Sequence, residues 1–120
     1  MILILTNEEF TMLLLHMNIM RKEIKKALKR NYGLFEGKKK VACYDSITAA
    51  LSEQLEEKGE CDSYNVEIDD EQATMLHSFL SFYTQELKRQ AEQEKIEYKE
   101  NETLQLLESV LRKVEEGCAA

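Results

Sequence analysis

Residues 7–26 read NEEFTMLLLHMNIMRKEIKK, and the spacing of their apolar side chains predicts a long amphipathic helix. The apolar residues recur at alternating steps of three and four, which keeps them on one face of a helix with 3.6 residues per turn. They are Phe10, Leu13, Met17, Met20, Ile24 and Ala27. At about 1.5 Å per residue, a helix of about 24 residues would be roughly 36 Å long and would span a small domain.

A second stretch, DEQATMLHSFLSFYTQELKR at 70–89, aligns on the first without gaps at an offset of 63 residues. Its apolar stripe follows the same rule and consists of Ala73, Leu76, Leu80, Tyr83 and Leu87. Each stretch begins with the pattern of a capping box, Thr6 with Glu9 and Asp69 with Gln72. The segments before them, 1–5 and 64–68, favour short strands, and we expect these to pair with each other or with another chain.

A shorter amphipathic segment follows each long helix. The first is marked by Ile47, Leu51 and Leu55 and should end near Gly59; the second is marked by Leu106 or Leu107, Val110 and Val114 and should end near Gly117. The predicted fold is therefore mainly α (α+β), a four-helix arrangement with two short strands in a single domain, 1–120. One interpretation is an internal duplication with half-repeats of about 1–59 and 64–117; the other is chance similarity between amphipathic helices.

Composition supports helices and gives no sign of catalytic chemistry. The chain lacks proline and has four glycines, whereas loops and β-turns would need more of both. The apolar run at the N-terminus, Met1–Leu5, is too short to span a membrane, so we expect a cytoplasmic protein without a membrane partner. Its three cysteines, Cys43, Cys61 and Cys118, form no CxxC pair, and His16 and His77 form no zinc-binding motif. We therefore expect no metal, no cofactor and no enzymatic activity.

The segment GLFEGKKK at 33–40 invites comparison with a phosphate-binding loop. A Walker A loop has four residues between its glycines and a hydroxyl residue after the lysine, but here three residues separate Gly33 from Gly37, and Lys39 follows Lys38. The local interpretation is that Gly33 makes a left-handed turn after the first helix. Leu34 and Phe35 would then fold back onto the core, and Gly37 would open the next connection.

Basic residues are concentrated between positions 21 and 40. This range carries a net charge of +7, and because the whole chain carries −7, the other hundred residues carry −14. The cations have two explanations: they favour the helix dipole and meet acidic groups elsewhere in the fold, or they bind a phosphate backbone or an acidic protein. We call this set the basic patch: Arg21, Lys22, Lys25, Lys26, Lys29, Arg30, Lys38, Lys39 and Lys40.

The first helix is apolar around most of its circumference between residues 10 and 20. Such a helix is either central in the core or in contact with a partner. The candidate surface for a partner or for self-association comprises Met12, Leu15, Ile19, Phe79 and Phe82.

These observations predict a small protein-binding regulator or inhibitor that acts through a helical surface, and we interpret it as a bacterial or phage accessory protein. One alternative is a nucleic-acid-associated protein that uses the basic patch. Another is a self-assembling structural component, and a homodimer through Met12, Leu15, Ile19 and the N-terminal strand is expected on this view.

Overall fold

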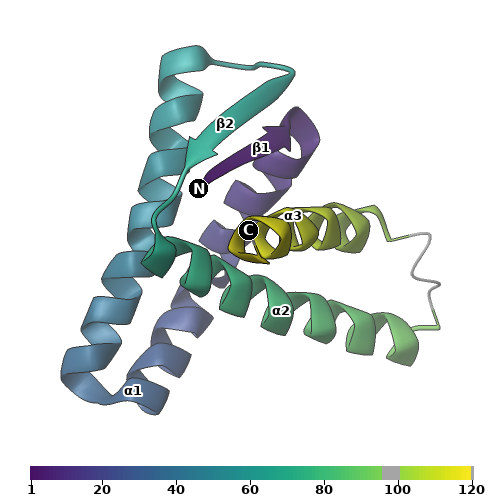
Figure 1. Ribbon diagram of the computed structural model, residues 1–120. Helices are drawn as coiled ribbons and strands as arrows, with labels where there is room; N and C mark the ends of the chain where they lie inside the picture. The colour runs from purple at the N-terminus through teal and green to yellow at the C-terminus, as the bar shows by residue number, and fades with distance from the viewer. Residues whose placement is uncertain (96–100, 120) are drawn as a thin grey trace.

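A computed structural model describes residues 1–95 and 101–119, and over these residues the chain is mainly helical with a small two-stranded sheet (Figure 1). This confirms the mainly α class and both short strands. In chain order the elements are β1 (Ile2–Thr6), α1 (Asn7–Lys58), β2 (Ser63–Glu67), α2 (Asp70–Gln93) and α3 (Glu102–Ala119).

Helix α1 folds back on itself at Gly33, where the backbone leaves the helical region (φ 82°, ψ −176°). Figure 1 shows the two resulting stretches side by side; we call residues 7–32 the first arm and residues 34–58 the second arm. The buried hydroxyl of Tyr44 donates to the carbonyl oxygen of Met17 over 2.6 Å and ties the arms together. The described residues form the three helices α1, α2 and α3, and α1 consists of two helical arms that meet at the non-helical Gly33, so the four-helix count is not confirmed. The internal duplication stays a prediction.

The turn at Gly33 corrects two expectations about its neighbours. Gly33 has the positive φ that was predicted, but Leu34 and Phe35 are 62% and 81% exposed instead of folding onto the core. The reversal takes a single residue, so the helix resumes at once and its first side chains lie on the outside of the turn. Gly37 opens no connection either: it lies buried inside the second arm, where a Cβ atom would be 2.9 Å from the Cα of Lys29.

We expect the substitution Gly37→Ala to destabilise the hairpin by about 1–3 kcal/mol, because the new methyl group would collide with backbone of the first arm. Helix propensity alone predicts the opposite sign, a gain of up to about 1 kcal/mol. Urea unfolding followed by circular dichroism distinguishes the two. A variant more stable than the wild type would show that the arms do not approach each other as described.

The two strands pair in an antiparallel register that places Leu3 opposite Val66 and Leu5 opposite Tyr64. These four side chains are buried on the inner face, whereas Ile2 and Ile4 on the outer face are 62% and 61% exposed. The expected pairing of the strands with each other is confirmed.

The helix ends follow the sequence signals with one exception. Both predicted capping boxes are present: Thr6 and Glu9 exchange side-chain and backbone hydrogen bonds at the start of α1, and Asp69 and Gln72 do the same at α2. Gly59 ends α1 with a positive φ of 62°, as expected. Gly117 does not end its helix, because α3 continues to Ala119. A Cβ atom at Gly117 would meet the flexible end of the Met1 side chain, which would have to move to make room.

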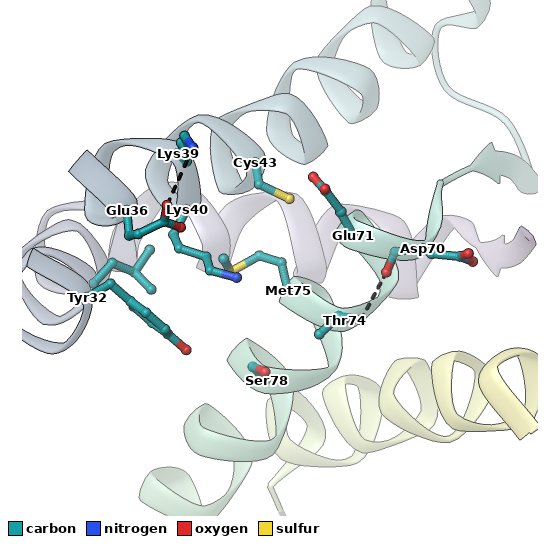
Figure 2. A pocket seen from close by; sticks show the side chains of 11 residues that line it. Tyr32, Glu36, Lys39, Lys40, Cys43, Asp70, Glu71, Thr74, Met75 and Ser78 are labelled. Carbon is teal, nitrogen blue, oxygen red and sulfur yellow. Dashed lines mark hydrogen bonds and ion pairs between the residues drawn. The ribbon is translucent and has the colours of Figure 1, made fainter.

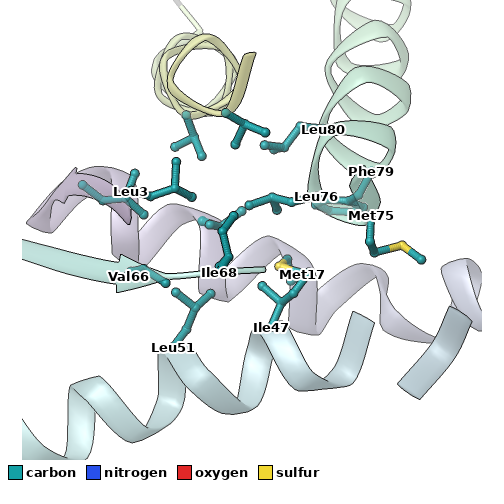
Figure 3. Packing of buried hydrophobic residues seen from close by; sticks show 14 of the residues in the cluster. Leu3, Met17, Ile47, Leu51, Val66, Ile68, Met75, Leu76, Phe79 and Leu80 are labelled. Carbon is teal, nitrogen blue, oxygen red and sulfur yellow. The ribbon is translucent and has the colours of Figure 1, made fainter. Parts of the chain in front are cut away.

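One hydrophobic core joins the sheet to all three helices (Figure 3). The inner face of the sheet packs on α1, where Met17 lies on the first arm and Ile47 and Leu51 lie on the second arm, and Leu76 and Leu80 of α2 belong to the same cluster. Helix α3 completes this core with Leu107, Val110 and Val114, all 0% exposed. The continuous core ties both halves of the chain to one another and fixes the relative positions of α1 and α2.

Candidate partner-binding surface

The five residues predicted for a partner surface separate into exposed and buried sets. Leu15, Ile19 and Phe82 are 50%, 57% and 52% exposed, large fractions for side chains of this size. Met12 is half-buried and packs against the core. Phe79 is wrong as a surface residue: it is only 3% exposed.

Phe79 is buried because it lies on the inner face of α2, among the rings at the centre of the fold. Its ring meets Tyr44 edge-on at 5.6 Å between centroids and stacks against Tyr83 at 5.5 Å. Position 82 is three residues further along the helix and points outward. The apolar pair Phe79 and Phe82 therefore divides between core and surface, which composition alone does not reveal.

A groove runs between the first arm of α1 and α2, with a volume of about 460 Å³. Ile19 and Phe82, from the two helices, both line it, together with the apolar side chains of Met20, Ile24 and Leu87. Its polar lining consists of Glu23, Arg30, Glu86 and Gln90. We call this hollow the α1–α2 groove. It joins two of the three exposed apolar residues into one continuous feature.

A partly buried hydrogen bond links the two helices on either side of the groove. The Nδ1 atom of His16 lies 2.7 Å from the hydroxyl of Tyr83. Burial lowers the pKa of His16 and raises the pKa of Tyr83, so it favours the neutral form of both side chains. This interaction links residues 67 positions apart and has no local sequence signal.

The same face of the first arm continues from apolar to basic residues. Leu15, Ile19, Lys22, Lys26 and Arg30 follow one another at steps of three and four, which keeps them in line along the helix. All five are exposed. Three members of the basic patch, Lys22, Lys26 and Arg30, therefore continue the line of Leu15 and Ile19 along the first arm.

Within the part of the chain that the structure describes, two members of the basic patch form ion pairs with acidic side chains. Arg21 forms two hydrogen bonds of 2.8 Å to Asp45, and this contact, aided by the charges of Arg21 and Lys25, lowers the pKa of Asp45. Lys39 lies 3.4 Å from Glu36. Within residues 1–95 and 101–119, the patch members that form no ion pair are Lys22, Lys25, Lys26, Lys29, Arg30, Lys38 and Lys40. Direct ion pairs within the described residues thus involve two of the nine patch members, and the expectation that acidic groups meet the other cations stays a prediction.

A second hollow, of about 370 Å³, lies between the second arm of α1 and the start of α2 (Figure 2). Figure 2 shows Lys39, Lys40 and Cys43 on one side and Glu71 and Met75 on the other. Burial raises the pKa of the Cys43 thiol, and the nearby Asp69 and Glu71 raise it further. A thiol in this setting stays protonated at neutral pH and is a poor nucleophile. Because both acidic and basic side chains line this hollow, its charge does not favour one class of ligand.

The other reactive or metal-ligating side chains of the described residues form no metal site or catalytic site. Among the residues described, no three His, Cys, Asp or Glu side chains converge in a way that could hold a metal ion. Cys43 and Cys61 are free thiols, and the side chain of Cys118 lies outside the described part of the chain. No helix within the described ranges is long and apolar enough to cross a membrane.

Sequence reasoning missed one buried charged cluster. Glu9, only 3% exposed, accepts hydrogen bonds from the side chains of Lys113 and Ser109 and from the backbone amide of Thr6. Burial alone would raise the pKa of Glu9, but these hydrogen bonds outweigh it and lower the pKa below its usual value. The cluster fastens α3 to the beginning of α1.

In comparisons of the chain with protein-family models, with curated proteins and with solved structures, nothing matched.

Proposed function

We propose that this protein is a non-catalytic regulator or inhibitor that takes an amphipathic helix of a partner protein into the α1–α2 groove. The observation that carries the proposal is the clustering of large exposed apolar side chains, Leu15, Ile19 and Phe82, on and beside this groove. Exposed apolar groups that gather around a hollow, rather than lying scattered, are typical of interaction sites.

The groove has the features of a site that receives a helix. Its two walls are helices, so the apolar side chains of a third helix, spaced at i, i+3, i+4 and i+7, can lie between them. Ile19 and Phe82 would contact the partner from opposite sides, and Met20 supplies an unbranched side chain that adapts to different occupants. The His16–Tyr83 hydrogen bond keeps the walls in place, so the groove is formed before binding.

Charge defines the partner further. Beyond Ile19, the stripe on the first arm carries Lys22, Lys26 and Arg30, none of which is neutralised by an ion pair in the described chain. On the opposite wall, Glu86 is paired with Arg89 at 2.9 Å. The attraction for negative charge on a partner therefore comes from the α1 side of the groove. The partner helix should present carboxylates on the flank that faces the first arm, beside an apolar ridge that enters the groove.

Affinity purification from the native host, followed by mass spectrometry, tests the proposal. Nuclease treatment of the lysate separates protein-mediated capture from capture through nucleic acid. We expect a nuclease-resistant protein partner with an acidic amphipathic helix, and a synthetic peptide of that helix should bind in solution. Capture that disappears with nuclease would instead favour the nucleic-acid alternative.

Self-assembly is a second candidate because the same face carries both signs of charge around its apolar residues. Glu23 and Glu86 line the groove together with Arg30, so two copies related by a twofold axis could pair opposite charges across Ile19. The chain would then be a homodimer at micromolar concentration.

On the self-assembly hypothesis, Leu15→Glu should yield a folded monomer, because Leu15 is half exposed and its replacement buries no charge. Light scattering at increasing concentration measures the mass of the wild type and of this variant. A wild type that stays monomeric at high concentration would rule out the dimer and leave the groove to a different protein.

A further inference from the structure

The end of the α1 hairpin exposes three large apolar or aromatic side chains around Gly33. Tyr32, Leu34 and Phe35 are 52%, 62% and 81% exposed. We call these three residues the apex. Phe35 is the most exposed of the large hydrophobic residues in the described chain.

The apex stands away from the core. The buried apolar residues nearest to the turn are Ile24 on the first arm and Val41 on the second arm. Gly33 lies nine residues beyond Ile24, a distance of about 13 Å along a helix. Figure 1 shows this end of α1 extending past α2, α3 and the sheet. The apex is therefore the part of this end of the molecule that projects farthest into the solvent.

Cations surround the hairpin behind the apex. Lys29 and Arg30 lie on the first arm and Lys38 lies on the second, and within the part of the chain that the structure describes none of the three has an ion-pair partner. The ammonium group of Lys40 lies 5.2 Å from the centre of the Tyr32 ring. From the tip inward, exposed apolar side chains are thus followed by cations, and the carboxylate beside the apex, Glu36, is paired with Lys39.

This order matches the layers of an anionic lipid surface, in which hydrocarbon lies beneath an interfacial zone and a layer of phosphates. We infer that the apex inserts Leu34 and Phe35 into an anionic membrane surface while the lysines behind it contact the headgroups. A peripheral contact of this kind needs no membrane-spanning segment. It also leaves the exposed apolar residues of the α1–α2 groove free, so it adds a second binding surface to the proposed function.

The composition of the apex favours lipid over the two other anionic partners. A single-stranded nucleic acid stacks on several aromatic faces in succession, but Phe35 is the one apex residue that offers an open ring: Tyr32 already has a cation on its ring, and Leu34 has no ring. An acidic protein would require a broad contact area, whereas the apex is the narrow, outward end of a hairpin. Aliphatic and aromatic side chains at a projecting tip are suited to a soft hydrocarbon layer.

Co-sedimentation of the full chain with lipid vesicles tests the inference. One set of vesicles contains phosphatidylcholine alone, and the other also contains phosphatidylserine. The wild type should sediment with the second set only, and binding should weaken as salt rises. Phe35→Ser should lower the partition coefficient by about tenfold, because an apolar ring no longer enters the hydrocarbon. The matched control, Phe82→Ser, removes an exposed ring in the groove and should leave partitioning unchanged.

Three results would overturn the inference. The first is no binding to vesicles that contain phosphatidylserine, and the second is an equal effect of the two phenylalanine substitutions. The third is binding that salt abolishes but Phe35→Ser does not change, which would indicate charge attraction without insertion. A single-stranded oligonucleotide serves as a parallel probe: binding that depends on Phe35, without vesicle binding, would assign the apex to nucleic acid instead. Circular dichroism verifies that each variant is folded.

Discussion

Replacement of Lys113 by methionine is expected to lower the free energy of unfolding by about 3–5 kcal/mol, the cost of leaving a buried charge without its partner. The carboxylate of Glu9 is the charge that would be left: its side chain is 4% exposed, whereas that of Lys113 is 35% exposed. Methionine keeps most of the lysine's apolar stem, so little of the loss would come from packing. The two side chains come from opposite ends of the chain, and the substitution should therefore loosen α3 from α1.

Chemical denaturation followed by circular dichroism measures this effect. The double variant Glu9→Gln, Lys113→Met should recover much of the lost stability, because a neutral amide costs less to bury than an unpaired carboxylate. Lys88→Met is the matched control, since Lys88 forms a more exposed ion pair with Glu108 at 3.7 Å, and pairs of that kind contribute only about 0–1 kcal/mol. Equal losses for the two lysine substitutions would contradict the assignment.

The same cluster predicts a direction for the pH dependence. The pKa of Glu9 is lower in the folded chain than its usual value, which approximates the unfolded chain. The stabilisation from Glu9 is therefore fully present above the usual pKa and is lost as the pH falls through the lower, folded pKa. Lys113→Met removes the principal hydrogen bond that lowers the pKa of Glu9. The free energy of unfolding of this variant should therefore lack the stabilisation that Glu9 gives the wild type above its usual pKa.

The second large effect is expected at the groove, where Ile19→Glu should weaken binding of the captured partner by about 100-fold. Ile19 lies between the apolar floor of the groove and the cationic part of the stripe. A carboxylate there would be desolvated by the partner and would repel the acidic flank expected on its helix. Isothermal titration calorimetry with the recovered partner or its helical peptide gives the affinity.

Ile4→Glu is the matched control for this substitution. Ile4 is 61% exposed and Ile19 is 57% exposed, but Ile4 lies on the outer face of β1 rather than beside the groove. Both variants should keep the stability of the wild type to within about 0.5 kcal/mol, because neither replaces a core residue. If the control weakens binding as much as Ile19→Glu does, the contact surface must include the sheet.

Local signals in the sequence predicted the elements well. The capping boxes at Thr6 and Asp69 depend on residues three positions apart, so they are visible in the sequence and are present in the structure. The alternating segments around Leu3 and Val66 predicted the strand pair for the same reason. Gly33 was correctly placed just past the first helical stretch, because glycine accommodates its positive φ.

Contacts between distant residues were not visible in the same way. The close approach of Gly37 to Lys29 depends on how the arms pack, and the exposure of Phe35 depends on how tightly the chain turns. The pair of Glu9 and Lys113 spans 104 residues, and Glu9 alone had only the signal of a helix cap. The division of Phe79 from Phe82 similarly required the position of α2 against α1.

Site-specific photo-crosslinking in the native host tests the central claim most directly. A photoreactive phenylalanine analogue is placed at position 19, beside the α1–α2 groove, or at position 4, on the outer face of the sheet. The account predicts a covalent adduct with a partner protein from position 19 and none from position 4. An adduct of twice the chain's own mass from position 19 would show self-assembly at the same face. An adduct from position 4 alone, or none from either position, would contradict the assignment of the groove as the binding surface.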